Sequence, residues 1–196
     1  MRAPLLCILL FLTACGYRFE ADEPVASVRT ITVPYVRGDA EGKLTSELIH
    51  QLTSSGYFEC RQGGGDLLLN AVIVSSNLDQ IGYRHERHGP TGHLRHRLIG
   101  TENRREVVVE ISLIDTRTNT ILIEPTKVVA HAEYDYIDPD SIRELLFINN
   151  EGVPERTITF SLGQLDSVEG GQDDSATPLY RHLSQKIVDG LINLNI

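Results

Sequence analysis

The chain has 196 residues, a formal net charge of −9, three cysteines and no tryptophan. This length suits one domain of ordinary size with a substantial core. The acidic balance argues against general nucleic-acid binding, because phosphate backbones are held mainly by surplus lysine and arginine.

The chain opens with a short apolar segment that ends in a lipobox-like motif. Residues 4–14 follow a single basic residue, Arg2, and are too few to span a bilayer, which needs about 20 residues. The sequence LTACG at residues 12–16 is typical of a bacterial lipoprotein signal. The alternative is an ordinary cleaved signal with a chance cysteine.

We therefore expect residues 1–14 to be a signal peptide and residues 15–27 to be a lipidated tether. Cys15 would carry an N-acyl diglyceride, and a bacterial lipoprotein anchor with two or three acyl chains is stable where a single chain is not. Gly16, in place of aspartate, favours the periplasmic face of the outer membrane.

Cys7 would leave with the signal, so no internal disulfide is expected. Cys60 is interpreted as a small apolar residue beside the core, with intermolecular pairing as the alternative.

The first structured segments are predicted to be a strand and a helix. Residues 28–36 alternate, with Ile31, Val33 and Tyr35 on one face, which predicts a strand. Leucines recur every fourth residue in residues 41–55, which predicts an amphipathic helix, and Gly56 follows at its C-terminal end. The three glycines at 63–65 lack the lysine and the context of a phosphate-binding loop.

Three further strands are predicted. Residues 66–78 are almost continuously apolar, as in a central strand packed on both sides. Residues 106–113 alternate with one apolar face, and residues 115–119 have turn chemistry, so a hairpin leads into a strand from Thr120. Pro125 favours an edge position or a bulge in that strand. Alternation resumes beyond Pro125 with the apolar face formed by Val128, Ala130, Ala132, Tyr134 and Tyr136.

The C-terminal part contains a polar insertion and a second helix. Residues 138–175 are interpreted as a mobile loop or an added subdomain, in which Ser141 and Glu144 form the capping box of a short helix. Residues 177–193 predict an amphipathic helix, whose apolar positions are Tyr180, Leu183, Ile187, Leu191 and Leu194. The expected fold is α+β: a single domain, residues 28–196, in which two helices pack on one face of a four-stranded mixed sheet.

A basic, histidine-rich stretch at residues 83–97 is nearly palindromic about residues 89–92. A turn there would pair five residues on each side, namely His88 with His93, Arg87 with Leu94, Glu86 with Arg95, His85 with His96 and Arg84 with Arg97. Residues 84–105 contain six arginines and four histidines against two glutamates, which leaves 12 of the 18 basic and 25 of the 27 acidic residues elsewhere. Positive charge is thus concentrated here on an acidic chain.

Three interpretations of this stretch compete. In the first, the charges only solvate an exposed hairpin and protect it from pairing with other chains. A metal site would use His85, His88, His93 and His96, but residues three apart in a strand point to opposite faces, so neither sequential pair chelates alone. An anion site is favoured by arginine forks, which match phosphate oxygens, and by histidine, which gains charge below a pH of about 6.5.

The motifs in this order resemble the LptE family of LPS-assembly lipoproteins. The resemblance comes from the lipobox ending in CGYRF (15–19), from VRTITVP (28–34) and from LTSELIHQL (44–52), and it runs to about Tyr136 and through the last helix. It implies a non-enzymatic outer-membrane protein that binds lipopolysaccharide or lipooligosaccharide and plugs an LptD-like β-barrel. It implies no cofactor beyond the lipid on Cys15. The acidic net charge, separately, predicts no nucleic-acid partner. The candidate lipopolysaccharide contacts are Arg84, Arg87, Arg95, Arg97, Arg104 and Arg105.

The insertion at 138–175 departs from this family pattern. Two other classes remain as alternatives. A lipoprotein scaffold that activates a cell-wall synthase shares the scheme of a strand, a helix ending in Gly-Tyr-Phe and further strands. A lipid-anchored hydrolase would use the histidines, but no serine or cysteine nucleophile motif accompanies them.

Overall fold

The computed structural model describes residues 28–88, 93–138, 146–156 and 167–194. The predicted signal peptide, the predicted lipidation site Cys15 and the predicted capping box of Ser141 and Glu144 lie outside the described residues. Within the described residues, no helix is long and apolar enough to cross a membrane.

The main sheet has five strands and is mixed. Their order is β2 (Phe58–Arg61), β1 (Arg29–Thr32), β3 (Leu67–His88), β4 (His93–Asp115) and β5 (Thr120–Asp135). β1 is parallel to both of its neighbours, whereas the β3–β4 and β4–β5 pairs are antiparallel. The predicted α+β class with a mixed sheet is confirmed, but the predicted count of four strands is wrong. The additional strand, β2, is only four residues long and carries two charged side chains, so its sequence has little strand signal.

β1 is shorter than the predicted strand at residues 28–36. Pro34 has no N–H to donate to a ladder, and the strand ends two residues before it. As a result Tyr35 is 58% exposed, against prediction, and Val36 is fully buried in its place. The chain then returns to the sheet through a parallel bridge between Arg37 and Val72.

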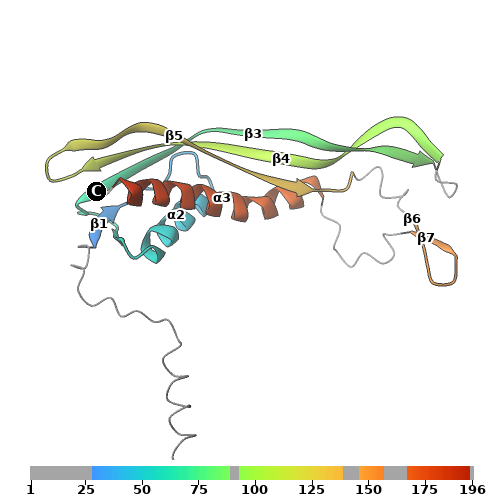
Figure 1. Cartoon of the computed structure of the whole chain (residues 1–196), viewed down its shortest axis with the longest axis horizontal. Helices are drawn as coiled ribbons and strands as arrows, with labels where there is room; N and C mark the ends of the chain where they lie inside the picture. Colours follow the sequence, from blue (N-terminus) through green and yellow to red (C-terminus); the bar gives the residue numbers. More distant parts are fainter. Residues whose placement is uncertain (1–27, 89–92, 139–145, 157–166, 195–196) are drawn as a thin grey trace, which may run out of the picture.

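Two helices, α2 (Lys43–Ser54) and α3 (Val168–Asn193), lie on the same side of the sheet (Figure 1). Leu44, Leu48 and Leu52 of α2 are fully buried, as the four-residue spacing predicts. Gly56 has a φ of 75°, the left-handed conformation expected just beyond a helix C-terminus. The two helices and the inner face of the sheet enclose one hydrophobic core.

α3 begins nine residues before the predicted helix at 177–193. Its N-cap is Ser167, whose hydroxyl oxygen accepts a hydrogen bond from the N–H of Gly170 at 3.1 Å. The first two turns bury small residues in place of leucines, and therefore have no apolar periodicity to detect. Gly171 lies so close to β5 that a Cβ there would be 2.7 Å from the Tyr134 ring. At the other end Leu194 is 53% exposed, so its predicted place on the apolar face is wrong.

β3 is central, as predicted, but it is not packed on both sides. Leu67, Leu69 and Ala71 point into the core. The opposite face has no helix over it in the described part of the chain, and Val74, at a register shift, is 48% exposed. The apolar run thus reflects one buried face plus a bulge at Val74, where the alternation of side chains between the two faces is interrupted.

β4 and β5 match their predicted patterns. Val107, Val109, Ile111 and Leu113 are buried on one face of β4. Asp115 opens the predicted turn, and its carboxylate accepts hydrogen bonds from the N–H groups of Thr118 and Arg117, which lower its pKa. β5 is an edge strand, and the register of its pairing with β4 shifts at Pro125. The edge position and the bulge that Pro125 predicts are therefore both present.

The insertion contains a small hairpin, β6 (Leu146–Ile148) and β7 (Pro154–Arg156). Its turn is held by Asn149, whose side-chain oxygen accepts hydrogen bonds from the N–H groups of Glu151 and Val153. Residues 146–148 are therefore a strand, and a short helix from Ser141 cannot extend through them. Cys60 is a free thiol that packs, partly buried, against the core.

Candidate functional site

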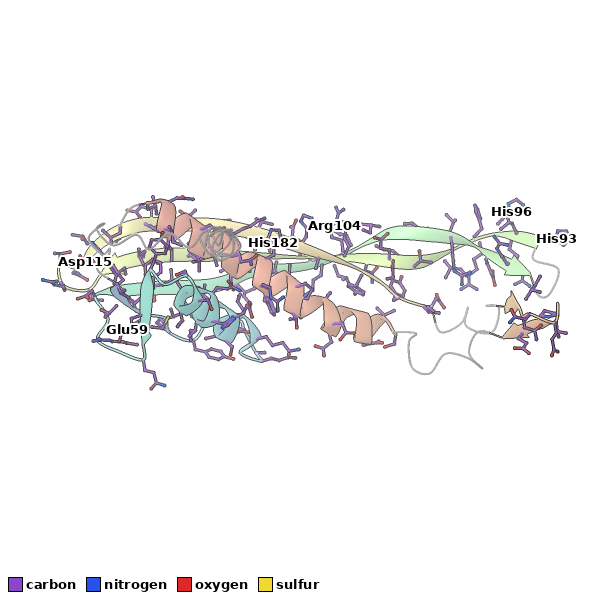
Figure 2. The ribbon with its side chains drawn as sticks, turned by 60° about the horizontal axis from the view of Figure 1, so that its bottom comes forward. Glu59, His93, His96, Arg104, Asp115 and His182 are labelled. Carbon is purple, nitrogen blue, oxygen red and sulfur yellow. The ribbon has the colours of Figure 1, made fainter. Side chains whose placement is uncertain are left out.

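β3 and β4 continue well beyond the rest of the sheet. The last pair between β4 and β5 is Glu102 with Asp135, so residues 81–88 and 93–101 form a two-stranded ribbon that no third strand joins within the described residues. We call these residues the arm. Figure 1 shows the arm reaching past the start of α3, and Figure 2 places His93 and His96 at the end of the molecule opposite Asp115. The predicted basic hairpin and the strands on either side of it are thus one continuous structure.

The predicted register of the arm is correct only at its tip. His88 pairs with His93 and Arg87 with Leu94, as the palindrome predicts. Nearer the body, however, His85 pairs with Leu98 and Arg84 with Ile99, so the predicted partners His96 and Arg97 are wrong. Residues 95–97 of β4 stand opposite Glu86 alone, which makes a bulge.

The bulge surrounds an ion pair whose carboxylate is buried and whose guanidinium group is partly exposed. Glu86 is only 6% exposed, and its carboxylate accepts a hydrogen bond from Nη1 of Arg95 at 3.1 Å. The predicted contact between these residues therefore occurs through side chains. The carbonyl oxygen of Arg95 also lies 3.2 Å from Nδ1 of His85. A carboxylate this buried needs its cationic partner, so Glu86 fixes the direction of Arg95.

The other candidate arginines of the arm differ in exposure. Arg87 and Arg97 are exposed and form no ion pair with any described residue. Arg84 is half-buried, on the same face as Glu86.

Arg104 and Arg105 lie in the part of β4 that pairs with β5, rather than in the arm. Arg104 reaches Glu133 of β5 with Nε at 2.9 Å. Arg105 donates to the Tyr180 hydroxyl at 3.3 Å, and its guanidinium is 5.8 Å from the centre of that ring. The first contact joins β4 to β5 and the second joins the sheet to α3, and the structure does not bring the two arginines to the tip.

The described histidine side chains of the arm form no ligand set for a metal ion. His85, His93 and His96 are exposed. His88 lies in β3, but its side chain is not among those that the structure describes. Among the described residues no group of three or more histidine, cysteine or acidic side chains is arranged to hold a metal ion. The arm can therefore offer cations and hydrogen-bond donors to an anion.

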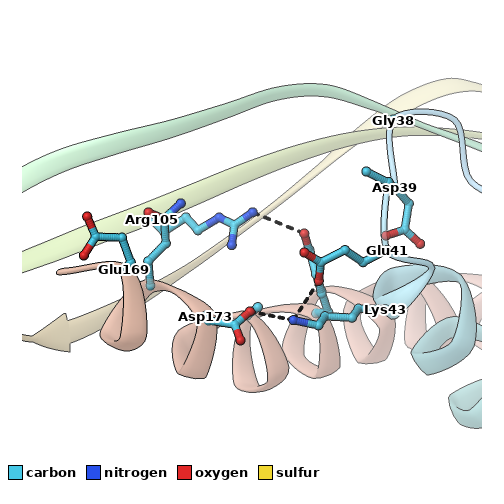
Figure 3. Close-up of a pocket in the computed structure, with 11 residues that line it drawn as sticks. Gly38, Asp39, Glu41, Lys43, Arg105, Glu169 and Asp173 are labelled. Atoms are coloured by element: carbon cyan, nitrogen blue, oxygen red, sulfur yellow. Dashed lines mark hydrogen bonds and ion pairs between the residues drawn. The ribbon is translucent and has the colours of Figure 1, made fainter. Parts of the chain in front are cut away.

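A second charged site, between the helices, was not predicted. A cavity of about 300 Å³ lies between the start of α2, the first turns of α3 and Arg105. Figure 3 shows Lys43 there between Glu41 and Asp173, with Nζ 2.7 Å and 2.6 Å from their carboxylates. These contacts raise the pKa of Lys43, and its ammonium group lowers the pKa of Asp173. Lys43 and Asp173 are 130 positions apart, so no sequence spacing reveals the pair.

Acidic residues outnumber basic ones around this cavity, so it does not suit a phosphate. Its contacts join α2 to α3 at the surface, which is a structural role. The candidate site is therefore the arm, where exposed cations concentrate at one end of an acidic molecule.

No protein-family model and no curated protein matches the chain. Among solved structures it is similar to a candidate lipoprotein of Caulobacter crescentus, with 13% identity over 84% of this chain and 86% of that one and a TM-score of 0.44. It is similar to rare lipoprotein B of Shewanella oneidensis, with 13% identity, coverage of 85% and 99%, and a TM-score of 0.39. It is also similar to an uncharacterised lipoprotein B of Nitrosomonas europaea, with 11% identity over 89% of this chain and 88% of that one and a TM-score of 0.41. TM-scores this low support no argument about shared function.

Proposed function

We propose that the protein is a non-enzymatic lipoprotein, anchored at the periplasmic face of the outer membrane, that binds lipopolysaccharide or lipooligosaccharide through the arm. The observation that carries this proposal is the arm itself. It projects beyond the sheet and carries the exposed side chains of Arg87, Arg97, His85, His93 and His96.

The chemistry of the arm suits a phosphorylated glycolipid. A guanidinium group matches phosphate and carboxylate oxygens with two parallel hydrogen bonds, and such charge-assisted bonds are among the stronger ones in proteins. Glu86 neutralises Arg95 from the buried side, so Arg87 and Arg97 are the cations we expect to contribute most to binding. Lipid A and the inner core carry several phosphates and acidic sugars, so more than one arginine can be used at once.

The expected anchor is consistent with a role beside a membrane barrel. The tether between Cys15 and the first strand, residues 16–27, reaches roughly 40 Å when fully extended. The folded part can therefore lie against or within a neighbouring β-barrel, as the resemblance to the LptE family implies. The proposed partners are an LptD-like barrel and the glycolipid, with no cofactor beyond the acyl chains.

Glycolipid binding is tested by removing the two exposed arginines. We expect Arg87→Ala with Arg97→Ala to weaken binding to purified lipopolysaccharide about tenfold or more and to flatten its dependence on salt. The matched control is Arg61→Ala with Arg117→Ala, which removes the same charge from exposed positions outside the arm. Equal affinity of the two double variants would mean that the arm is not the binding site.

The barrel partner is tested separately, by affinity purification from solubilised outer membrane followed by mass identification. A large β-barrel in stable stoichiometry is the expected result. Recovery of a cell-wall synthase without a barrel would instead favour the alternative, an activator scaffold.

A further inference from the structure

One face of the arm combines large apolar side chains with cations. Tyr83, His85 and Arg87 alternate along β3 and so point to the same face. The ladder sets Leu98 opposite His85 and Leu94 opposite Arg87 on that face. We call these five residues the arm face.

The apolar members of the arm face are unusually open to solvent. Tyr83 is 56% exposed, Leu98 57% and Leu94 64%. The opposite face of the ribbon, in contrast, buries Ile99 to 5% and Glu86 to 6%. An exposed strand that served only to keep the protein soluble would not need two leucines and a tyrosine, whereas a contiguous apolar patch marks an interaction surface.

The arm face has no carboxylate. The one acidic residue among residues 81–88 and 93–101 of the arm is Glu86. It lies on the other face and is paired with Arg95. The exposed surface is therefore apolar and cationic together. Elements of this composition lie in the headgroup region of a bilayer, where their apolar side chains reach the upper acyl chains and their cations attract anionic lipids.

We propose that the arm face rests in the headgroup region of an anionic lipid bilayer. The chain outside the described residues gives a reason to choose a bilayer as the partner, because the expected lipid on Cys15 holds the protein beside one. The contact is shallow, because among the described residues no further strand pairs with the ribbon edges, and backbone groups without partners cannot enter the hydrocarbon region. This inference goes beyond the proposed function, which concerns a single glycolipid bound by exposed arginines.

The absence of tryptophan from the chain makes the contact directly measurable. Leu94→Trp places a single tryptophan, which can be excited selectively over tyrosine, on the arm face at a highly exposed position. The matched control is Ile121→Trp on β5, which is 55% exposed near the opposite end of the molecule. Both variants are prepared as the full chain and reconstituted in phosphatidylcholine vesicles with or without phosphatidylglycerol, with brominated lipids as quenchers.

We expect the emission of Leu94→Trp to move to shorter wavelength and to be quenched by brominated lipid when phosphatidylglycerol is present, while Ile121→Trp is quenched much less. Adding Arg87→Gln to Leu94→Trp should abolish most of the quenching. Circular dichroism checks that each variant is folded. Absence of quenching at position 94, or equal quenching at positions 94 and 121, would overturn the inference.

Lipopolysaccharide binding by the same preparations separates the two proposals. Normal glycolipid binding without quenching at position 94 contradicts the bilayer contact alone. Quenching at position 94 together with glycolipid binding that is insensitive to loss of Arg87 and Arg97 contradicts the proposed function alone. A spectral shift of Leu94→Trp that requires an added membrane protein and does not occur with lipid would also overturn the inference.

Discussion

The side chain of Gln80 donates a hydrogen bond to the hydroxyl oxygen of Tyr136 across 2.7 Å, at the point where the arm leaves the sheet. It reaches this partner by crossing the backbone of Gly100, where a Cβ would overlap both polar groups. Gly82 is nearby at a register shift, with Glu102 against it. The base of the arm therefore depends on two glycines that let the strands twist while β5 ends.

We predict that Gly100→Ala displaces the Gln80 side chain and costs about 1–3 kcal/mol of unfolding free energy, as overpacking commonly does. Denaturant unfolding measures the loss. Gly63→Ala is the control, because nothing lies within 4 Å of a Cβ there. In a Gln80→Ala background the cost of Gly100→Ala should shrink, and an unchanged cost would contradict the proposed clash.

Glu86 limits the positive charge of the arm, so Glu86→Gln should increase affinity for lipopolysaccharide. The substitution keeps the shape of the side chain, removes one buried negative charge and releases Arg95 from its ion pair. A titration against lipopolysaccharide at low salt measures the gain, which high salt should reduce. Glu59→Gln makes the same chemical change at the other end of the molecule (Figure 2) and should leave affinity unaltered. A similar gain in both variants would point to net charge alone.

The Lys43–Asp173 pair should make stability depend on acid pH. The ammonium of Lys43 lowers the pKa of Asp173 below its ordinary value of 3.8, so the folded state holds this carboxylate ionised more strongly than the unfolded chain does. The contribution is present above pH 3.8 and is lost as pH falls through the lowered pKa. Both groups are exposed, so the effect is small. Thermal unfolding between about pH 2 and 6 should show a shallower acid dependence for Asp173→Asn than for the parent. Identical slopes would contradict a contribution from this pair.

Periodicity predicts the parts of this fold in which one face of an element is apolar. Leu44, Leu48 and Leu52 identify α2, and the alternation around Val107 identifies β4, because burial of a single face leaves a repeat of about 3.6 or 2 residues. Pro125 is informative for the same reason: its missing N–H restricts where the strand can lie.

The features that the sequence misses depend on tertiary contacts. The first turns of α3 pack through glycine, serine and alanine, so they resemble a polar loop until Tyr134 is placed against them. The two-residue shift of register in the arm is stabilised by the ion pair between the buried Glu86 and the partly exposed Arg95, whereas a palindrome alone favours continuous pairing. The same holds for the candidate site. The sequence alone reveals the basic stretch, but it does not reveal which of its arginines remain exposed in the fold.

Gly171 and Gly190, two of the three glycines of α3, should respond to alanine in opposite directions. Gly171 is buried against β5, and a Cβ there would lie 2.7 Å from the Tyr134 ring and 3.2 Å from the carbonyl oxygen of Asp135. Gly171→Ala must push the first turns of α3 away from the sheet, so we expect it to lower the unfolding free energy by about 1–3 kcal/mol.

Gly190 lies in the same helix and is exposed, and a Cβ added there would have no neighbouring atom within 4 Å. Gly190→Ala should therefore raise the unfolding free energy by up to about 1 kcal/mol, because alanine loses less backbone entropy in a helix interior. Denaturant unfolding of both variants under one set of conditions gives the two signs directly. Stabilisation by both substitutions would mean that α3 does not pack through Gly171 and that the contact between its N-terminal turns and β5 is wrong.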